Sequence, residues 1–183
     1  MAVVLIVGVF FAMSHFSSNH QHEYGIKDTI EEPADLIYEA RDTILNINGE
    51  IFKYTGTMKN GVPDGILGRA EFIDDVIMQR NTYNGGWKNG KREGKGTLRY
   101  KNRDKYEGDF ADNTFNGCGI VTYASGASYK GQFVDGKRKG LGIYCSATGK
   151  TEMGEWDKVI IRHMSKVDFD ALFDSVCVSQ DGN

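Results

Sequence analysis

Tyr83-Asn84-Gly85-Gly86-Trp87 opens a pattern that returns after 23 residues as Tyr106-Glu107-Gly108-Asp109-Phe110, and after 23 more as Tyr129-Lys130-Gly131-Gln132-Phe133. Each stretch carries a tyrosine, a glycine two residues later and a large aromatic residue two residues after that. Glu152-Met153-Gly154 falls on the next interval, with Trp156 in the aromatic position. A fixed period of this length is typical of stacked supersecondary units rather than of a globular enzyme core.

Each repeat is predicted to form a β-hairpin. Aromatic residues and glycines alternate along both halves of the first full unit, as Tyr83, Gly85 and Trp87, then Gly94, Gly96 and Tyr100. Alternate residues of a strand share one face, and Asn89-Gly90 between the two halves is a strong hairpin signal. Glycine weakens a strand, so its repetition needs a steric reason. We predict that aromatic rings lie over the bare backbone of glycines in neighbouring strands.

The repeated positions are predicted to form a structural core. One hairpin cannot bury its aromatic face alone, whereas several stacked hairpins bury a continuous one. The core residues are Tyr54, Gly56, Tyr83, Gly85, Trp87, Gly94, Gly96, Tyr100, Tyr106, Gly108, Phe110, Gly117, Gly119, Tyr123, Tyr129, Gly131, Phe133, Gly140, Gly142, Gly154 and Trp156.

A degenerate unit precedes the regular ones. It opens at Tyr54-Thr55-Gly56, has Met58 in the aromatic position and reaches the next tyrosine after 29 residues instead of 23. Its glycines Gly65 and Gly68 are three residues apart rather than two, which predicts a β-bulge. The remaining inserted residues are expected within residues 74–81.

The pattern from Tyr54 to about Trp156 resembles the MORN repeat (membrane occupation and recognition nexus). The resemblance implies an elongated, twisted antiparallel sheet of hairpins used for protein or membrane contact, and it implies no catalytic residue. We therefore expect a mainly β hairpin solenoid with short capping helices at both ends and an apolar helix at the N-terminus. The expected divisions are residues 1–16 (apolar anchor or signal), 17–53 (linker, short helix and lead-in hairpin), 54–157 (repeat sheet) and 158–183 (capping helix and tail).

The N-terminal residues 2–13 are unbroken apolar sequence. They are shorter than the roughly 20 residues that a membrane-spanning helix needs. Their length suits a signal peptide, although a basic flank is missing, and a fragment of a longer span is a further possibility. We expect membrane attachment or export, with a buried terminal helix as the alternative. The acidic residues that follow favour a non-cytoplasmic body.

Both ends of the repeats carry further local signals. Pro33 could open a short helix through Arg41 that buries Leu36, Ile37 and Ala40, and Asn48-Gly49 predicts a hairpin turn. Near the C-terminus, Phe169, Leu172, Phe173 and Val176 have the spacing of an amphipathic helix, with Ser165 or Asp168 as N-cap. We expect this helix to cover Ile120, Leu141 and Ile143 on the sheet face opposite the aromatic residues. A free, partner-binding helix is the alternative.

The middle of the chain is basic. Residues 83–150 hold 13 Lys and Arg against 6 Asp and Glu, although the whole chain carries a net charge of -3. A solvated face explains this pattern, and contact with an anionic partner is the alternative. The residues that would make such contact lie at the turns: Lys88, Lys91, Arg92, Lys137, Arg138 and Lys139.

The sequence offers little support for catalysis, metal or cofactor binding. Cys118, Cys145 and Cys177 lack zinc-site spacing and are expected to be free thiols. Thr148-Gly149-Lys150-Thr151 lacks the first glycine of a phosphate-binding loop, and His15, His20 and His22 lack partner ligands. His163 and Cys177 have no orienting element beside them.

We therefore predict a non-catalytic, membrane-associated scaffold that binds a protein partner, with no cofactor and no nucleic acid. The alternative is direct recognition of anionic membrane lipid by the basic turns.

Overall fold

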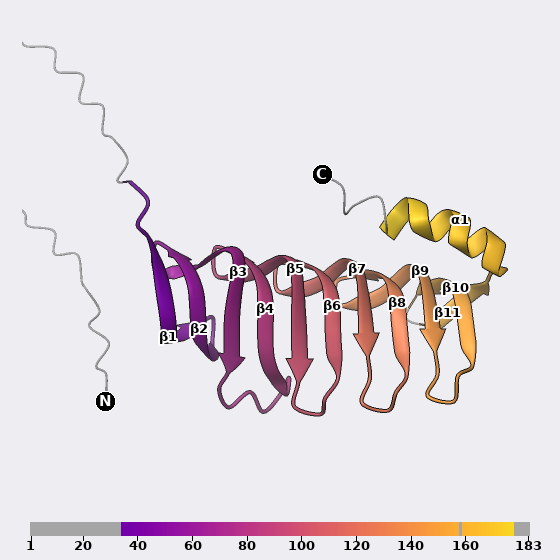
Figure 1. Ribbon diagram of the computed structural model, residues 1–183, viewed down its shortest axis with the longest axis horizontal. Coiled ribbons are helices and arrows are strands. Elements are labelled where there is room, and N and C mark those ends of the chain that lie inside the picture. The colour runs from indigo at the N-terminus through magenta and orange to yellow at the C-terminus, as the bar shows by residue number, and fades with distance from the viewer. Residues whose placement is uncertain (1–33, 158, 178–183) are drawn as a thin grey trace, which may run out of the picture. The chain divides into compact units, whose positions relative to one another are not determined.

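The computed structural model describes residues 34–157 and 159–177. These residues form one antiparallel sheet of eleven strands in sequence order, followed by one helix (Figure 1). The strands are β1 (Ile37–Ile47), β2 (Glu50–Lys59), β3 (Val62–Phe72), β4 (Arg80–Lys88), β5 (Lys91–Tyr100), β6 (Lys105–Ala111), β7 (Thr114–Thr122), β8 (Ser128–Val134), β9 (Lys137–Cys145), β10 (Thr151–Asp157) and β11 (Val159–His163), and the helix is α1 (Lys166–Cys177). The predicted hairpin architecture is confirmed, and the sheet extends beyond the repeats at both ends.

Four hairpin turns carry an Asn-Gly or Asp-Gly pair in the left-handed conformation. Asn48-Gly49, Asn60-Gly61, Asn89-Gly90 and Asp135-Gly136 all have positive φ at both positions. Two such residues in a row are required by the tight turn whose twist matches the flanking strands. These turns fix the register of β1 with β2, β2 with β3, β4 with β5, and β8 with β9.

A row of nine glycines crosses the sheet from β2 to β10. Cross-strand pairing places each of them directly opposite the next: Gly56, Gly68, Gly85, Gly96, Gly108, Gly119, Gly131, Gly142 and Gly154. A Cβ built on Gly119 would lie 2.5 Å from the Tyr106 hydroxyl oxygen, and one on Gly96 would lie 2.5 Å from that of Tyr83. The tyrosine rings therefore lie against the bare glycine backbone, as predicted.

Each tyrosine is fixed at its far end by a hydrogen bond. The hydroxyl of Tyr106 donates to the carbonyl oxygen of Asp109 at 2.8 Å, and that of Tyr83 donates to Gly86 at 2.9 Å. Tyr54 and Tyr129 donate to the equivalent carbonyls. All four tyrosines have no solvent exposure. Burial raises the pKa of Tyr54 to about 12 and also raises the pKa of the other three hydroxyls.

A second set of aromatic rings links neighbouring repeats. The Phe110 ring meets Tyr83 of the preceding unit and Tyr106 of its own edge-on, with centroids 5.0 and 5.2 Å apart. Trp87, Phe133 and Trp156 make the same kind of contact. Edge-to-face packing is favoured by the quadrupoles of the rings. The aromatic residues thus form one continuous core rather than separate clusters.

Bulges bend each regular hairpin around this core. In β4, one residue separates Gly85 from Trp87. Their partners in β5, Gly96 and Arg92, are separated by three residues, so β5 holds two extra residues at this point. The first glycine of each pair lies in such a bulge with positive φ, at Gly94, Gly117 and Gly140. Bulges bend strands and increase twist. The predicted bulge between Gly65 and Gly68 of the degenerate unit is also present.

The helix predicted from Pro33 through Arg41 is wrong in the part that the structure describes. Residues 37–47 form the strand β1, in which Ala40 is buried opposite Gly56 whereas Leu36 and Ile37 are exposed. Pairing along β2 gives this segment backbone hydrogen bonds and continues the glycine row with a small residue. These tertiary interactions override the weak local helix signal.

The predicted C-terminal helix is present, and it packs on part of the apolar patch that it was expected to cover. Phe169 and Phe173 of α1 are buried against Leu141, Ile143 and Met153. Ser165 is the N-cap: its hydroxyl oxygen accepts from the Asp168 amide at 3.2 Å and donates to the Asp168 carboxylate at 2.7 Å. Leu172 departs from the prediction because it is 45 % exposed, and Ile120 remains 37 % exposed.

A disulfide joins Cys118 of β7 to Cys177, the last residue of α1, with 5.6 Å between the two Cα atoms. The expectation of three free thiols is therefore wrong for this pair, and Cys145 is the free cysteine among the described residues. The helix carries Cys177 back across the sheet to β7, a proximity that strand spacing alone does not indicate.

The predictions for residues 1–16 and for residues 17–33 of the linker segment lie outside the described residues. Within the described part, no helix has the length and apolar character needed to cross a bilayer.

The glycine–tyrosine contact predicts a large effect from one methyl group. Gly119→Ala should destabilise the protein by about 1–3 kcal/mol, because the added Cβ overlaps the Tyr106 ring. Thr122→Val, at an exposed position of the same strand, should change the stability by no more than about 0.5 kcal/mol. Urea unfolding of both variants measures the difference, and equal midpoints would contradict the packing argument.

Candidate interaction surface

The structure places the predicted repeat core inside the sheet rather than on a binding face. From Trp87 to Trp156, six of its aromatic residues are at most 4 % exposed, namely Trp87, Tyr106, Phe110, Tyr129, Phe133 and Trp156, whereas Tyr100 and Tyr123 are half-buried. The same ring geometry recurs in each repeat and gives these residues a structural role, so they do not form a contact surface.

Exposed apolar side chains are concentrated in the N-terminal part of the sheet, which comprises β1, the start of β2 and the first, degenerate unit. Among the described residues, eleven of the sixteen large exposed hydrophobic side chains lie between Leu36 and Met78. Ile66 and Leu67, inside the β3 bulge, are 98 % and 70 % exposed. The regular repeats therefore bury most of their apolar residues, whereas the N-terminal part of the sheet displays them.

A buried donor without an acceptor lies where the first regular unit packs against the degenerate one. The indole nitrogen of Trp87 has no hydrogen-bond partner among the described residues. The equivalent indole of Trp156 donates to the Gly142 carbonyl oxygen at 2.9 Å. A buried unsatisfied donor is costly and marks a local departure from the optimum of the fold.

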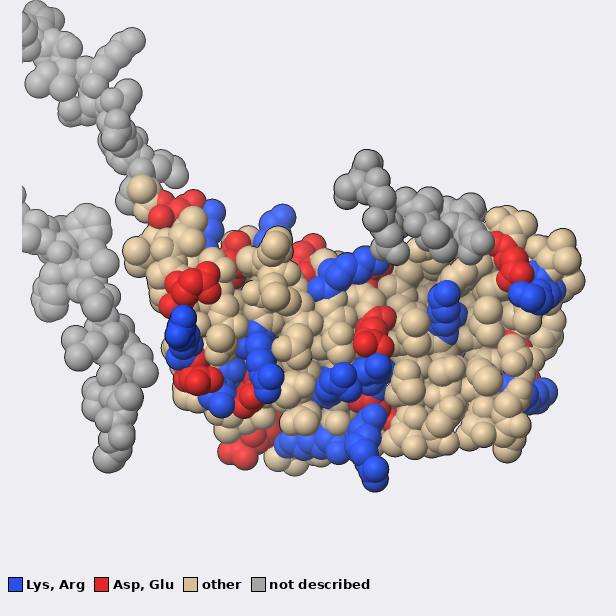
Figure 2. Space-filling view, in the orientation of Figure 1, with Lys and Arg blue, Asp and Glu red and all other residues tan. Residues whose placement is uncertain are grey.

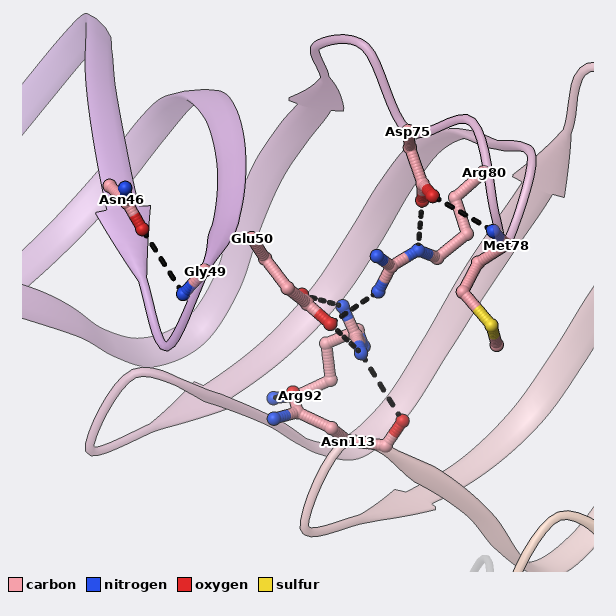
Figure 3. A network of polar contacts seen from close by, with 8 residues as sticks. All are labelled: Asn46, Gly49, Glu50, Asp75, Met78, Arg80, Arg92 and Asn113. Carbon is pink, nitrogen blue, oxygen red and sulfur yellow. Dashed lines mark hydrogen bonds and ion pairs between the residues drawn. The ribbon is translucent and has the colours of Figure 1, made fainter.

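A network of charged side chains lies at one end of the first unit (Figure 3). The Glu50 carboxylate accepts from Arg80 at 2.5 Å and from Arg92 at 3.0 Å. Arg80 also pairs with Asp75, and Arg92 donates to the Asn113 carbonyl oxygen at 3.3 Å. Arg92 and Arg80 are only 3 % and 8 % exposed. Two cations and two carboxylates make the network neutral, which is the condition for burying such groups.

The ring of Phe72 packs against both arginines of this network. The guanidinium carbon of Arg80 lies 4.4 Å from the Phe72 ring centroid and that of Arg92 lies 5.6 Å from it. Burial by itself would raise the pKa of Glu50, but the hydrogen bonds and charges of Arg92 and Arg80 outweigh burial and lower it. The pKa of Asp75 is lowered in the same way, chiefly by Arg80 and the Met78 amide against burial.

The network holds the inserted segment between β3 and β4. The Asp75 carboxylate accepts from the Met78 amide at 3.0 Å (Figure 3), and the Lys101 amide donates to the Gln79 carbonyl oxygen at 2.8 Å. Asp74 and Gln79 both have left-handed backbone, with φ of 52° and 53°. This segment contains the insertion predicted in residues 74–81. Its conformation is specified by several contacts rather than left open.

The basic turn residues do not form one available cationic surface. Arg92 is buried in the network, so its predicted role as an exposed contact is wrong. Arg138 lies over aromatic rings, 4.6 Å from the Tyr129 centroid, and donates to the Tyr123 hydroxyl. Lys91 pairs with Asp112 at 2.5 Å. Lys88, Lys137 and Lys139 are exposed and make no ion pair within the described residues.

The alternation of side chains between the two faces of a strand could have predicted that Arg92 and Arg138 lie on the aromatic face. Arg92 lies an even number of residues before Gly94 and Gly96, and Arg138 stands in the same relation to Gly140 and Gly142. Both side chains therefore share the face of the aromatic rings. The partners Glu50, Asp75 and Arg80 were missed because they come from three separate segments, which sequence spacing does not bring together.

The visible outer face of the sheet carries charges of both signs. Acidic and basic side chains lie interspersed over β2 to β6, whereas the surface over β8 to β10 carries few charges (Figure 2). Pairs such as Lys53 with Glu71 and Lys95 with Asp109, both 3.0 Å, explain the mixture. The excess positive charge of residues 83–150 is thus largely distributed rather than gathered at one site.

The MORN-repeat family model matches residues 54–66, 83–105, 106–128 and 129–151. The chain belongs to the MORN-repeat family. The three regular MORN units coincide with the hairpin pairs described above, and the short match in the first unit ends at Ile66, inside the β3 bulge. No curated protein matches the chain significantly.

Most of the exposed apolar residues, and three of the four members of the buried network, lie in stretches that the MORN model leaves unmatched. Arg92, the fourth member, lies in the first regular unit. Within the described residues, no group of three or more His, Cys, Asp or Glu side chains could hold a metal ion. Cys177 is bonded to Cys118 and does not present a free thiol beside His163. β1 and the first unit form the candidate interaction surface.

The network predicts a specific response to mutation. Glu50→Gln should destabilise the protein by about 1–3 kcal/mol at pH 7, because it leaves two buried guanidinium groups poorly paired. Glu71→Gln is the control, because Glu71 pairs with Lys53 and Arg69 at the exposed surface, where such pairs contribute little.

The same network predicts acid sensitivity. The carboxylates of Glu50 and Asp75 have lowered pKa values in the folded state, so they favour folding above their ordinary values of 4.5 and 3.8. This contribution is lost as the pH falls through the lowered values. The melting temperature of the parent should fall more steeply below pH 4 than that of Glu50→Gln. Parallel curves would show that the network is not coupled to folding.

Proposed function

We propose that this chain is a non-catalytic MORN scaffold that binds a protein partner through β1 and its first unit and is attached to a membrane through residues 1–16. The observation that carries the proposal is the concentration of exposed apolar side chains between Leu36 and Met78. Exposed apolar patches on soluble domains usually mark interaction sites. The regular repeats supply a rigid support for that unit.

The titratable groups support a binding role rather than catalysis. Catalytic sites gather groups of perturbed pKa in a cleft where substrate can reach them. Here the largest upward shifts belong to tyrosine hydroxyls that donate to backbone carbonyls inside the core. The carboxylates of lowered pKa are held by arginines within the network.

The free edge of β1 is the favoured contact for a protein partner. Among the described strands, β1 pairs with β2 alone, so its other side presents backbone donors and acceptors. Leu36, Ile37 and Tyr38 at the start of this edge are 64 %, 63 % and 43 % exposed. An extended segment of a partner can add to such an edge, with main-chain hydrogen bonds and apolar contacts together.

Site-specific photocrosslinking in the native host tests the contact. A photoreactive residue at Ile37 should give a discrete crosslinked protein, whereas one at Thr122, an exposed position in a regular repeat, should not. The crosslinked band should be identified by mass spectrometry. Crosslinks from position 122 alone would move the interface to the regular repeats and contradict the proposal.

The disulfide supports a body in an oxidising compartment. Disulfides persist outside the cytosol and are rare within it. The two cysteines are 59 residues apart in the sequence. A disulfide that closes a long loop typically stabilises the folded protein by about 2–4 kcal/mol. Together with the acidic residues that follow the apolar N-terminus, it favours a non-cytoplasmic side of the membrane.

Thiol trapping checks this location. Protein taken from the native host into acid and then alkylated should be modified at Cys145, whereas Cys118 and Cys177 should react only after reduction. Mass spectrometry of the peptides distinguishes the three positions. Alkylation of all three without reduction would argue for a reducing compartment.

Recognition of anionic lipid by basic turns is the second candidate. Lys88 lies at the β4–β5 turn, and Lys137 and Lys139 lie at and after the β8–β9 turn. Three exposed lysines would each add about 1 kcal/mol near an anionic membrane. Binding of this kind weakens strongly with salt.

A further inference from the structure

The inserted segment of the first unit ends in an apolar tip. Val76, Ile77 and Met78, which we call the loop tip, are 73 %, 92 % and 56 % exposed. The tip lies at the sheet edge that also carries the β5–β6, β7–β8 and β9–β10 turns (Figure 1). Those three turns are built from polar and small residues around Asn102, Ser125 and Thr148. Among these four described connections, only the insertion contains exposed large apolar side chains.

Contacts of Asp75, the residue before the loop tip, hold the tip in place. The Asp75 carboxylate binds both Arg80 and the Met78 amide, and Lys101 donates to the Asp75 carbonyl oxygen at 3.3 Å. Burying the arginines of the network is expensive, so a network of this kind is better evidence for a specified conformation than for stability. These contacts fix the base of the loop in the conformation in which the three side chains of the tip are exposed.

The size and shape of the tip favour a bilayer over a protein as its occupant. A stable protein interface buries about 800 Å² on each partner with a complementary surface. Three consecutive side chains on a protruding turn provide far less area. A fluid lipid surface, by contrast, surrounds a small convex tip on all sides and needs no matching shape.

The chain outside the structure allows this contact. Residues 17–33 separate the apolar residues 1–16 from the described part, and when fully extended they would span roughly 55–60 Å. The tip lies at the opposite end of β1 from Leu36, and the eleven residues of that strand span roughly 35 Å. A membrane attachment at residues 1–16 can therefore leave the tip at the same bilayer.

We propose that the loop tip inserts Val76, Ile77 and Met78 into the interface of a phospholipid bilayer and so orients the sheet on the membrane. This proposal rests on the membrane attachment proposed above. It assigns the contact to apolar insertion and not to the basic turns, which lie at other positions of the sheet.

Charges near the tip balance one another. Asp74 at the start of the segment and Asp104 in the neighbouring turn offset Lys101 and Arg103. Insertion should therefore be insensitive to salt and should not require anionic lipid. Recognition by Lys88, Lys137 and Lys139 would show the opposite behaviour.

Depth-dependent quenching in the full chain tests the proposal. In a Cys145→Ser background, Ile77→Cys and Thr148→Cys each receive an environment-sensitive fluorophore, and the chain is reconstituted in phosphatidylcholine vesicles with or without phosphatidylserine. Lipid-borne spin labels should quench the probe at position 77 and place it about 5–10 Å below the headgroup level. The probe at position 148, on another turn of the same edge, should remain quenched by aqueous iodide. Met78→Asp should abolish lipid quenching at position 77, whereas Ile66→Asp, at a 98 % exposed position outside the segment, should not.

Flotation of the same vesicles separates this proposal from the proposed function. A chain that floats while position 77 stays accessible to iodide overturns the insertion and leaves the membrane attachment standing. A chain that does not float overturns both. Shielding of position 77 by a native extract, without lipid quenching, would assign the tip to a protein instead. Quenching that high salt removes would likewise contradict apolar insertion.

Discussion

The contact of a tyrosine ring with bare glycine backbone is the constraint on which the rest of the sheet depends. The single-layer sheet has no second sheet against which to bury a core, yet Tyr83 and Tyr106 have no solvent exposure. This is possible because the glycine row lets each ring lie flat on its own sheet, where its hydroxyl reaches a backbone carbonyl. The bulges then bend the strands around the rings, and Phe110 and its equivalents join one unit to the next.

An array built in this way has two ends that must be treated separately, because each unit is stabilised mainly by its neighbours. At the C-terminal end, α1 covers Leu141 and Ile143, and a disulfide fixes the last residue of the helix to β7. At the other end, β1 continues the sheet with Ala40 opposite Gly56 but leaves an open edge among the described strands. One end is closed by packing, whereas the other displays apolar side chains.

Much of the fold could be predicted from the sequence because the period is encoded in short-range contacts. The hairpins, the Asn-Gly turns, the glycine row and the helix with its Ser165 cap all follow from spacing within about 20 residues. The strand at residues 37–47 and the bond between Cys118 and Cys177 did not follow, because each depends on neighbours brought close by tertiary structure. The candidate site was predicted least well: its network unites Glu50, Asp75 and Arg92 from segments far apart in sequence.

The first unit breaks the rules of the repeat in ways that cost stability. It exposes Ile66 and Ile77 almost fully, and at its junction with the first regular unit the Trp87 indole is unsatisfied and two arginines are buried. Natural sequences are locally consistent, and departures without a structural gain are expected at functional positions. In a linear array such departures are tolerated best at a terminal unit, because they weaken one interface and leave the following repeats intact. The regular units can thus remain a rigid support while the first unit carries the surfaces that meet a partner or a membrane.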